Sequence, residues 1–351
     1  MRSYSILPKL SVLWLVVVVS VTMLACALWF PAQAMAEANK CPAPNVRNDV
    51  RPDVVGTPTQ VDMGVRLIDL TGIDDVNQSM TVDFAVIMSW MDPRLAELNG
   101  CVVPLTSVWE PGIGVFNSGR LFRSEPEVVR ISEGGQVTYS QRFFGTIATY
   151  HNLRNFPFDR QIFRISMYPF LHSEKEIVLK VNEQVTGVRN ILNISSWNVE
   201  RVRGVVDSLV IDAFDQNHST YVFEVHASRI TEYYIWKVIL PLCLIVAMSW
   251  AVFWVNPAQF GPQIGLSATS MLTLIAFIFA TTNMVPALGY FTIFDYFIVG
   301  STVLVFLAFV ESLTASFLVA KGKAKTAERI DGISRFAFPA VFIIFVAMVL
   351  S

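Results

Sequence analysis

The chain alternates polar and apolar residues in five stretches between residues 61 and 228. Turn-forming clusters such as Glu133-Gly134-Gly135 separate them, and no helical period extends beyond one or two short stretches of this region. Short alternating strands at regular spacing are typical of an antiparallel, immunoglobulin-like β-sandwich. We therefore predict a sandwich domain over residues 37–232. Its strands are predicted at VDMGVRLIDL (61–70), SMTVDFAVIMSW (79–90), QVTYSQRF (136–143), QIFRISMY (161–168) and STYVFEVHAS (219–228).

The pattern changes at Ile235, beyond which long apolar segments replace the alternation. No residue between Lys237 and Asp295 is charged. A helix of about 20 apolar residues crosses a bilayer, and three segments reach that length. The fourth is long enough if its helix begins at Arg329, which makes it roughly 34 Å long. We predict a transmembrane four-helix bundle over residues 233–351, with helices at about 235–255, 264–283, 292–320 and 329–351.

The first 36 residues have the pattern of a secretory signal peptide. Arg2 and Lys9 lie near the start, an apolar run covers 10–30, and two overlapping Ala-x-Ala sites end at Ala36. A retained anchor helix is the alternative, because the run is long. A lipoprotein site at Cys26 is disfavoured by the apolar residues that follow it.

The charges of the loop 321–328 predict the orientation of the chain. Lys321, Lys323 and Lys325 lie in this loop, and basic loops stay in the cytoplasm. Four spans then place the sandwich and the C-terminus outside. We expect a multi-pass protein of the cell inner membrane, with both parts in the periplasm.

Composition supports the membrane assignment and excludes other classes. The chain is 53% hydrophobic and 15% charged, whereas soluble domains carry about 25% charge. A net charge of −2 lacks the basic face of a nucleic-acid binder. We find no metal-ligand spacing and no nucleophile–base pattern, so we expect no metal, no cofactor and no enzyme activity. Cys41 and Cys101 either form a disulfide or are unrelated thiols.

The second predicted span carries one stripe of residues at alternating steps of four and three, which is one face of a helix. The stripe is small or polar in its first half and apolar in its second. Such a face either packs against other helices or lines a path for water. Its members are Gly265, Thr269, Leu272, Ala276, Phe279 and Asn283.

The chain contains the motif WMDPRL (90–95), and further on Trp109-Glu110-Pro111 with Asn117. They resemble the WxDxRL signature and the WxP…N segment of one family, the pentameric ligand-gated ion channels of the Cys-loop receptor superfamily. FPFDRQ (156–161) is similar to the centre of its signature loop. The segments 231–254, 265–273 and 329–345 resemble its first, second and fourth spans. The matching motifs extend over residues 45 to 350 and follow one another in the same order as in the family. The short basic loop and the absence of the two cysteines of the signature loop resemble a prokaryotic member.

The resemblance implies a homopentamer in a lipid bilayer. An agonist bound between the sandwich domains would open a pore lined by the second span. Leu272 and Phe279 would then form hydrophobic gates, which close a pore by dewetting. The alternative is a membrane-anchored sensor that does not conduct ions.

The resemblance also implies a coupling interface between the sandwich and the spans. The family's loop cysteines fall at Thr149 and Phe163, so packing must hold this loop. Asp159 is expected to pair with Arg229. The alternatives are a core hairpin and solvated turn charges. The predicted interface consists of Asp74, Asp75, Phe156, Pro157, Phe158, Asp159, Arg229 and Pro286.

The agonist and the permeant ion are less well defined. Family members bind agonists in an aromatic cage, although each candidate could equally be strand core. Ile87 stands where receptors for amino-acid transmitters carry an arginine. GLSATSMLT resembles the anion-selective branch, but residues 37–236 hold 24 acidic and 18 basic residues, which weakly favours cations. The ligand candidates are Phe116, Phe170, Phe214, His218 and Tyr221.

Overall fold

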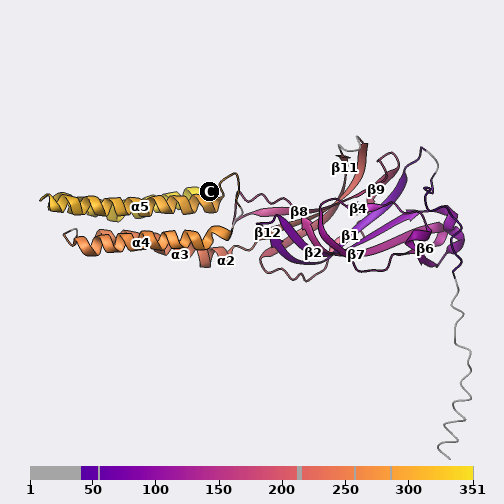
Figure 1. Cartoon of the computed structure of the whole chain (residues 1–351), viewed down its shortest axis with the longest axis horizontal. Coiled ribbons are helices and arrows are strands. Elements are labelled where there is room, and N and C mark those ends of the chain that lie inside the picture. Colours follow the sequence, from indigo (N-terminus) through magenta and orange to yellow (C-terminus); the bar gives the residue numbers. More distant parts are fainter. Residues whose placement is uncertain (1–40, 54–55, 212–215, 257, 285–286, 351) are drawn as a thin grey trace, which may run out of the picture. The chain divides into compact units, whose positions relative to one another are not determined.

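The computed structural model describes residues 41–53, 56–211, 216–256, 258–284 and 287–350. The predicted signal peptide at 1–36 lies outside the described residues. Within them, the strands gather in one part and four long helices in another (Figure 1).

Two sheets form the strand-rich part. In the larger, the order is β10 (Gly187–Val188), β1 (Thr59–Asp74), β2 (Ser79–Met91), β7 (Gln136–Ala148), β6 (Val128–Ser132) and β3 (Val102–Pro104), with β5 (Ser118–Arg123) beside β7 and β9 (Ile177–Val181) beside β1. In the smaller, the order is β11 (Trp197–Ile211), β12 (Gln216–Arg229), β8 (Arg160–Pro169) and β4 (Ile113–Val115). Short 3-10 turns cover Pro93–Leu98, Leu105–Ser107 and Glu133–Gly135.

All five predicted strands are present. They correspond to β1, β2, β7, β8 and β12, and the pairs among them are antiparallel. Among the strands of the described residues, only β9 and β10 run parallel to a neighbour, which is β1 for both. The long strand β11 was not predicted, because VERVRGVVD within it mixes charged and apolar residues without a clear period.

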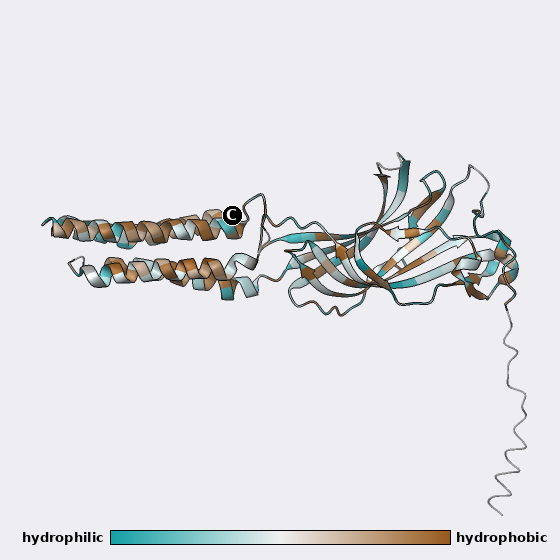
Figure 2. Cartoon of the chain, in the orientation of Figure 1, coloured by the Kyte–Doolittle hydropathy of each residue, from teal (hydrophilic) through white to brown (hydrophobic). Residues whose placement is uncertain are grey.

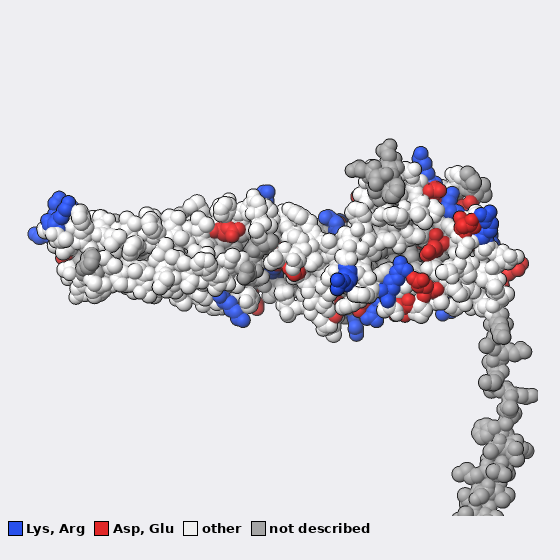
Figure 3. Space-filling model, viewed as in Figure 1, with Lys and Arg blue, Asp and Glu red and all other residues white. Residues whose placement is uncertain are grey.

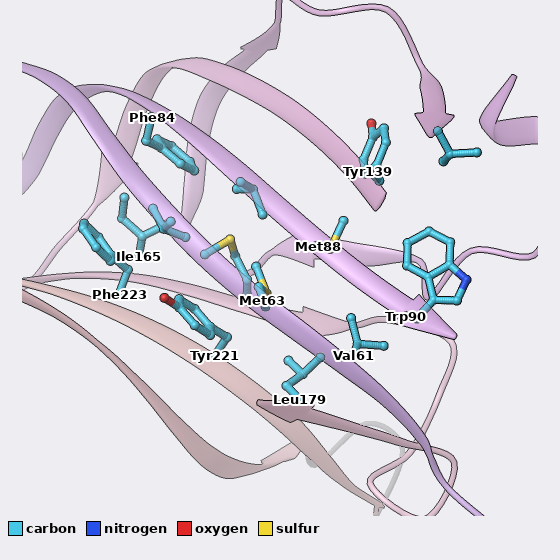
Figure 4. Packing of buried hydrophobic residues seen from close by; sticks show 14 of the residues in the cluster. Val61, Met63, Phe84, Met88, Trp90, Tyr139, Ile165, Leu179, Tyr221 and Phe223 are labelled. Carbon is cyan, nitrogen blue, oxygen red and sulfur yellow. The ribbon is translucent and has the colours of Figure 1, made fainter. Parts of the chain in front are cut away.

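The apolar residues of both sheets meet in one core (Figure 4). Phe84 comes from the larger sheet and Phe223 from the smaller, and both are fully buried. Trp90 and Trp109 pack edge to face, with ring centres 6.1 Å apart. Each fully buried side chain of this size contributes about 1.5–3 kcal/mol relative to exposure, so the core holds the two sheets together.

Residues of the WxDxRL signature and of the WxP…N segment make hydrogen bonds within the sandwich. Asp92 is completely buried, and both of its carboxylate oxygens accept hydrogen bonds of 2.8 Å from the Arg94 guanidinium. Asn117 donates to the carbonyls of Ala148 and Arg164, which belong to different sheets. These motifs therefore stabilise the sandwich and its strand ends.

Four helices of the described chain are long and apolar enough to cross a membrane. The first continuous helix comprises α2 (Glu232–Tyr234), a π-helical turn (Ile235–Ile239), α3 (Leu240–Trp250) and a 3-10 turn (Ala251–Trp254). The others are α4 (Phe260–Thr281), followed by a turn at Thr282–Met284, α5 (Ile293–Ala320) and α6 (Ala324–Leu350). Most of their residues are hydrophobic (Figure 2).

The structure corrects the predicted length of one loop and decides between the two alternatives for Cys41 and Cys101. The loop predicted at 321–328 is shorter, because α6 already begins at Ala324. Lys325 is a good helix former, as are the alanines around it, and a search for apolar runs misses a polar first turn. Among the described cysteines only Cys243 is free, whereas Cys41 and Cys101 are both disulfide-bonded, so these two are not free thiols.

Candidate functional site

Arg229, the last residue of β12, binds two carboxylates at once. Its Nε and Nη2 donate to the two oxygens of Asp159, at 2.7 and 3.1 Å. Its Nη1 and Nη2 donate to the two oxygens of Asp75, at 2.7 and 3.1 Å. The predicted pair of Arg229 and Asp159 is therefore present, and only 2% of either side chain is exposed.

Three separate segments bring these groups together. Asp75 lies in the turn between β1 and β2, and Asp159 directly precedes β8. The Arg229 backbone N–H also donates to the Asp159 carbonyl, at 3.2 Å. The Gln161 amide donates to Asp159 Oδ2 at 2.6 Å, so this carboxylate is held from both sides.

Aromatic rings enclose the guanidinium of Arg229. Its central carbon lies 4.2 Å from the Trp197 ring centre, 4.8 Å from that of Phe156 and 5.9 Å from that of Tyr234. A cation over ring faces is attracted by their negative potential, more strongly where water is excluded. Trp197 was not predicted from the sequence, because nothing in the sequence around a tryptophan at the start of a strand indicates that it contacts Arg229.

The charges of the cluster reinforce one another. Burial alone would lower the pKa of Arg229, but hydrogen bonds from its side chain to Asp159 and Asp75 raise that pKa above its usual value. Burial alone would raise the pKa of Asp75, but hydrogen bonds from His151 and Arg229 outweigh it and lower that pKa. The cation and this carboxylate therefore stay charged at neutral pH.

The loop before β8 joins this cluster to the helices. Phe156 is fully buried, and its ring packs edge to face on Tyr234 at 4.9 Å and on Phe294 at 5.9 Å. The backbone N–H of Phe294 donates to the Phe156 carbonyl at 3.2 Å, and that of Ile293 to the Arg154 carbonyl at 2.9 Å. The loop therefore contacts the starts of the first and third spans.

The other predicted members of the interface lie in different environments. The helix ends cover Phe156, whereas Phe158 is 38% exposed. Asp74 does not join the cluster, since its exposed carboxylate binds Asn77 instead. Pro157 follows Phe156 through a cis peptide bond. Pro286 lies outside the described residues.

The stripe on α4 is exposed in the single chain. The structure describes the exposure of five of its residues, and all five are exposed: Gly265, Thr269, Leu272, Ala276 and Phe279. Leu272 is 68% and Phe279 76% exposed, and other membrane helices also carry exposed apolar side chains, such as Phe336 at 77%. The side chain of Asn283 lies outside the described part of the structure.

The opposite face of α4 packs on α5 through buried polar groups. Ser267 donates to Ser312 at 3.0 Å, and Ser316 donates to the Gln263 amide oxygen at 2.9 Å. Leu274 is fully buried on the same face. The serines thus hold the bundle together, whereas Thr269 faces away from it.

Three of the five ligand candidates gather around Tyr168 of β8. Its ring centre lies 5.8 Å from that of Phe116, 6.3 Å from that of Phe170 and 5.6 Å from that of His218. Phe116 and Phe170 are more than half exposed. Sequence reasoning missed Tyr168, which reads as an ordinary strand residue.

The other ligand candidates do not join this group. Tyr221 is fully buried in the sandwich core, where it points among Met63, Ile165 and Phe223 (Figure 4). The prediction for Tyr221 was wrong, because alternation alone does not say which side of a strand faces the core. Phe214 lies outside the described residues.

Family models match both parts of the chain. Residues 45–231 match the neurotransmitter-gated ion-channel ligand binding domain. Residues 238–327 match the neurotransmitter-gated ion-channel transmembrane region. The first match alone covers more than half of the chain.

Individual relatives are more distant. A proton-gated ion channel of Gloeobacter violaceus is 25% identical over 323 residues, which is 90% of this chain and 87% of the relative. A γ-aminobutyric acid receptor subunit beta of Lymnaea stagnalis is 24% identical, over 79% of this chain and 59% of the relative. The subunit beta-4 of Gallus gallus is 24% identical, over 77% and 57%. The chain thus spans a little over half the length of these receptor subunits.

Proposed function

The chain belongs to the neurotransmitter-gated ion-channel family, and we propose that five copies of it form a ligand-gated channel whose pore is lined by α4. The family consists of pentameric channels rather than enzymes. The chain is accordingly a multi-pass membrane protein with an extracellular ligand-binding domain. We propose further that the five copies are identical, that α4 lines the pore and that the pore prefers cations.

The two faces of α4 carry the proposal. One face buries Gln263, Ser267 and Leu274 against the bundle, and the other leaves the stripe from Gly265 to Phe279 uncovered. A single stripe cannot enclose a water path, whereas five copies around a symmetry axis can. This supports a homopentamer in which the uncovered stripe faces the axis.

Two apolar rings form the gate in this arrangement. Leu272 and Phe279 lie seven residues apart on the stripe, or roughly 10 Å along the helix axis. Five such side chains offer a passing ion no polar partner, and the ion must shed water at high cost. Thr269 lies one turn before Leu272, on the side away from Phe279. Five copies of its hydroxyl group would form a polar ring next to the Leu272 ring.

The cluster around Arg229 transmits the opening signal. It joins the β1–β2 turn and the loop before β8 to the start of the first span, and Phe156 extends it to α5. A shift of either sandwich segment must therefore move charges and rings that touch the helices. Such packed groups change arrangement in discrete steps rather than continuously.

The agonist binds at the aromatic group of Phe116, Tyr168, Phe170 and His218. Exposed ring faces suit an organic cation. A carboxylate ligand is disfavoured, because Ile87 stands where family receptors for such ligands carry an arginine. Protons and small amines are the first probes to apply, since one relative is named a proton-gated channel.

Cations pass in preference to anions. The outer domain carries six more acidic than basic residues between Glu37 and Trp236. Charged side chains of both signs are scattered over the face of this domain that Figure 3 shows. Five copies would concentrate cations at the entrance, although screening over about 8–10 Å weakens the effect. The segment 261–263 is Gly-Pro-Gln, so it holds no charged residue that would set the opposite preference.

The remaining features follow from the family resemblance and the charge pattern. The chain is a prokaryotic member with a cleaved signal peptide at residues 1–36. The sandwich and the C-terminus lie in the periplasm, and the exposed Lys321 and Lys323 lie at the cytoplasmic end of the bundle.

Single-channel recording from purified protein in a planar bilayer tests the proposal. Stepping the pH and adding small amines should evoke unitary currents. In asymmetric salt the reversal potential of the current should lie closer to the equilibrium potential of the cation than to that of chloride. A reversal near the chloride equilibrium potential would refute cation preference, and a complete absence of current would favour a sensor that does not conduct.

A further inference from the structure

His151 lies against the Arg229 cluster, in the loop between β7 and β8. Its side chain is fully buried. Its Nδ1 is 3.0 Å from Asp75 Oδ1. The same oxygen accepts from Arg229 Nη2 at 3.1 Å. One carboxylate oxygen is thus shared between the histidine and the arginine.

Residues outside this loop hold His151 in place. The His151 backbone N–H donates to the Gln78 side-chain oxygen at 2.7 Å. The ring packs edge to face on Phe163, with centres 5.1 Å apart. Within the described structure its Nε2 has no hydrogen-bond partner. The contact with Asp75 is therefore the one polar contact of the ring there.

The chemistry of the contact sets the direction of the hydrogen bond. An ionised carboxylate only accepts, so the ring nitrogen that faces it must carry the hydrogen. Such a donor limits rotation of the Asp75 carboxylate and leaves both oxygens aimed at Arg229. Gln161 gives the same support to the second carboxylate, Asp159, at 2.6 Å.

We propose that His151 is a positioning residue of the coupling junction, which orients Asp75 for Arg229 and so sets how firmly the β1–β2 turn holds the start of the first span. Its effect on gating rests on the proposed function. Its effect on the Asp75–Arg229 contact does not. The charged groups that face His151 are Asp75 and, behind it, Arg229 and Asp159.

Two substitutions at this position separate positioning from filling of space. His151→Asn keeps an N–H donor close to the position of Nδ1, whereas His151→Leu fills the site without a donor. Each is made in the full chain, alone and together with Asp75→Asn. The apparent unfolding temperature of the purified protein in detergent is measured for all of them.

The expected result is a difference between Leu and Asn that depends on Asp75. His151→Leu should lower the unfolding temperature by about 3 °C or more, and His151→Asn by less. With Asp75→Asn present, the two substitutions should have the same effect. An equal Leu–Asn difference in both backgrounds, or no difference in either, would overturn the inference.

Currents test the consequence for gating. In the Leu272→Ser background, which is expected to conduct without agonist, His151→Leu should change the open probability about fivefold or more. His151→Asn should remain closer to the parent. If every variant is silent, the proposed function fails, and the unfolding temperatures alone decide on His151. If currents flow but His151→Leu matches the parent, His151 does not position the junction for gating.

Discussion

Asp74 and Asp75 are neighbours in the chain, but their carboxylates bind different groups. Asp75 Oδ2 accepts from Arg229 Nη1 at 2.7 Å, and its side chain is 12% exposed. Asp74 Oδ2 accepts from the amide of Asn77 at 2.7 Å, on the surface. The two residues therefore form a matched pair for experiment, with the same side chain at adjacent positions where β1 ends and the turn begins.

The first prediction uses this pair. Asp75→Asn removes a buried partner of a buried cation and should cost about 1–3 kcal/mol of stability. Asp74→Asn changes an exposed charge, and Asn also caps turns, so it should cost about 0.5 kcal/mol or less. Thermal unfolding measures the first effect, and currents should change only for Asp75→Asn. Equal effects of the two substitutions would contradict a special role for Asp75.

The second prediction concerns the pair of Arg229 and Asp159. Arg229→Glu places a carboxylate beside two others and among aromatic rings. It should cost about 3–5 kcal/mol and weaken gating, with pentamers still present. Adding Asp159→Arg should restore only part, because Asp75 and the rings still face position 229. If stability and gating of the double variant are no better than the two single effects added together, Arg229 and Asp159 do not act as a pair in coupling.

The third prediction concerns acid stability. The folded-state pKa of Asp75 is lowered, because hydrogen bonds from His151 and Arg229 outweigh its burial. Its ionised form therefore stabilises the fold at neutral pH, and this stabilisation is lost as the pH falls below about 4, the unfolded value. The stability difference between wild type and Asp75→Asn should shrink from pH 7 to pH 3. A difference that grows toward pH 3 would show that the sign is wrong.

The fourth prediction concerns assembly. The exposed face of α4 leaves Leu272 and Phe279 uncovered in one chain, and symmetric closure places them around an axis. Native mass measurement in mild detergent should give five copies of the chain. Monomers and dimers alone would be incompatible with the proposed pore.

Five strands and the four membrane helices were predicted from the sequence because each has a clear alternation or a long apolar run. Alternation in β2 and β12 follows from one buried face, and long apolar runs define the helices. The pairing of Arg229 with Asp159 was predicted only through the family resemblance, since no local pattern links residues 70 positions apart.

Single side chains that act between distant segments were not predictable. His151 and Asp75 are 76 positions apart, and both lie in irregular segments without a period. Tyr168 and Tyr221 are both strand aromatics, but one adjoins exposed rings and the other fills the core. Which side of a strand faces outward at its end depends on sheet packing, which the local sequence does not contain.

The most direct test of the central claim compares Leu272→Ser with Leu274→Ser. The two leucines lie on opposite faces of α4, with 68% and 0% of the residue exposed. Leu272→Ser should wet the gate and raise the basal current of a well-assembled protein. Leu274→Ser should instead cost about 2–5 kcal/mol of stability without a leak. A stable, pentameric Leu272→Ser protein whose resting current and agonist sensitivity match the parent would contradict a pore lined and gated by this face of α4.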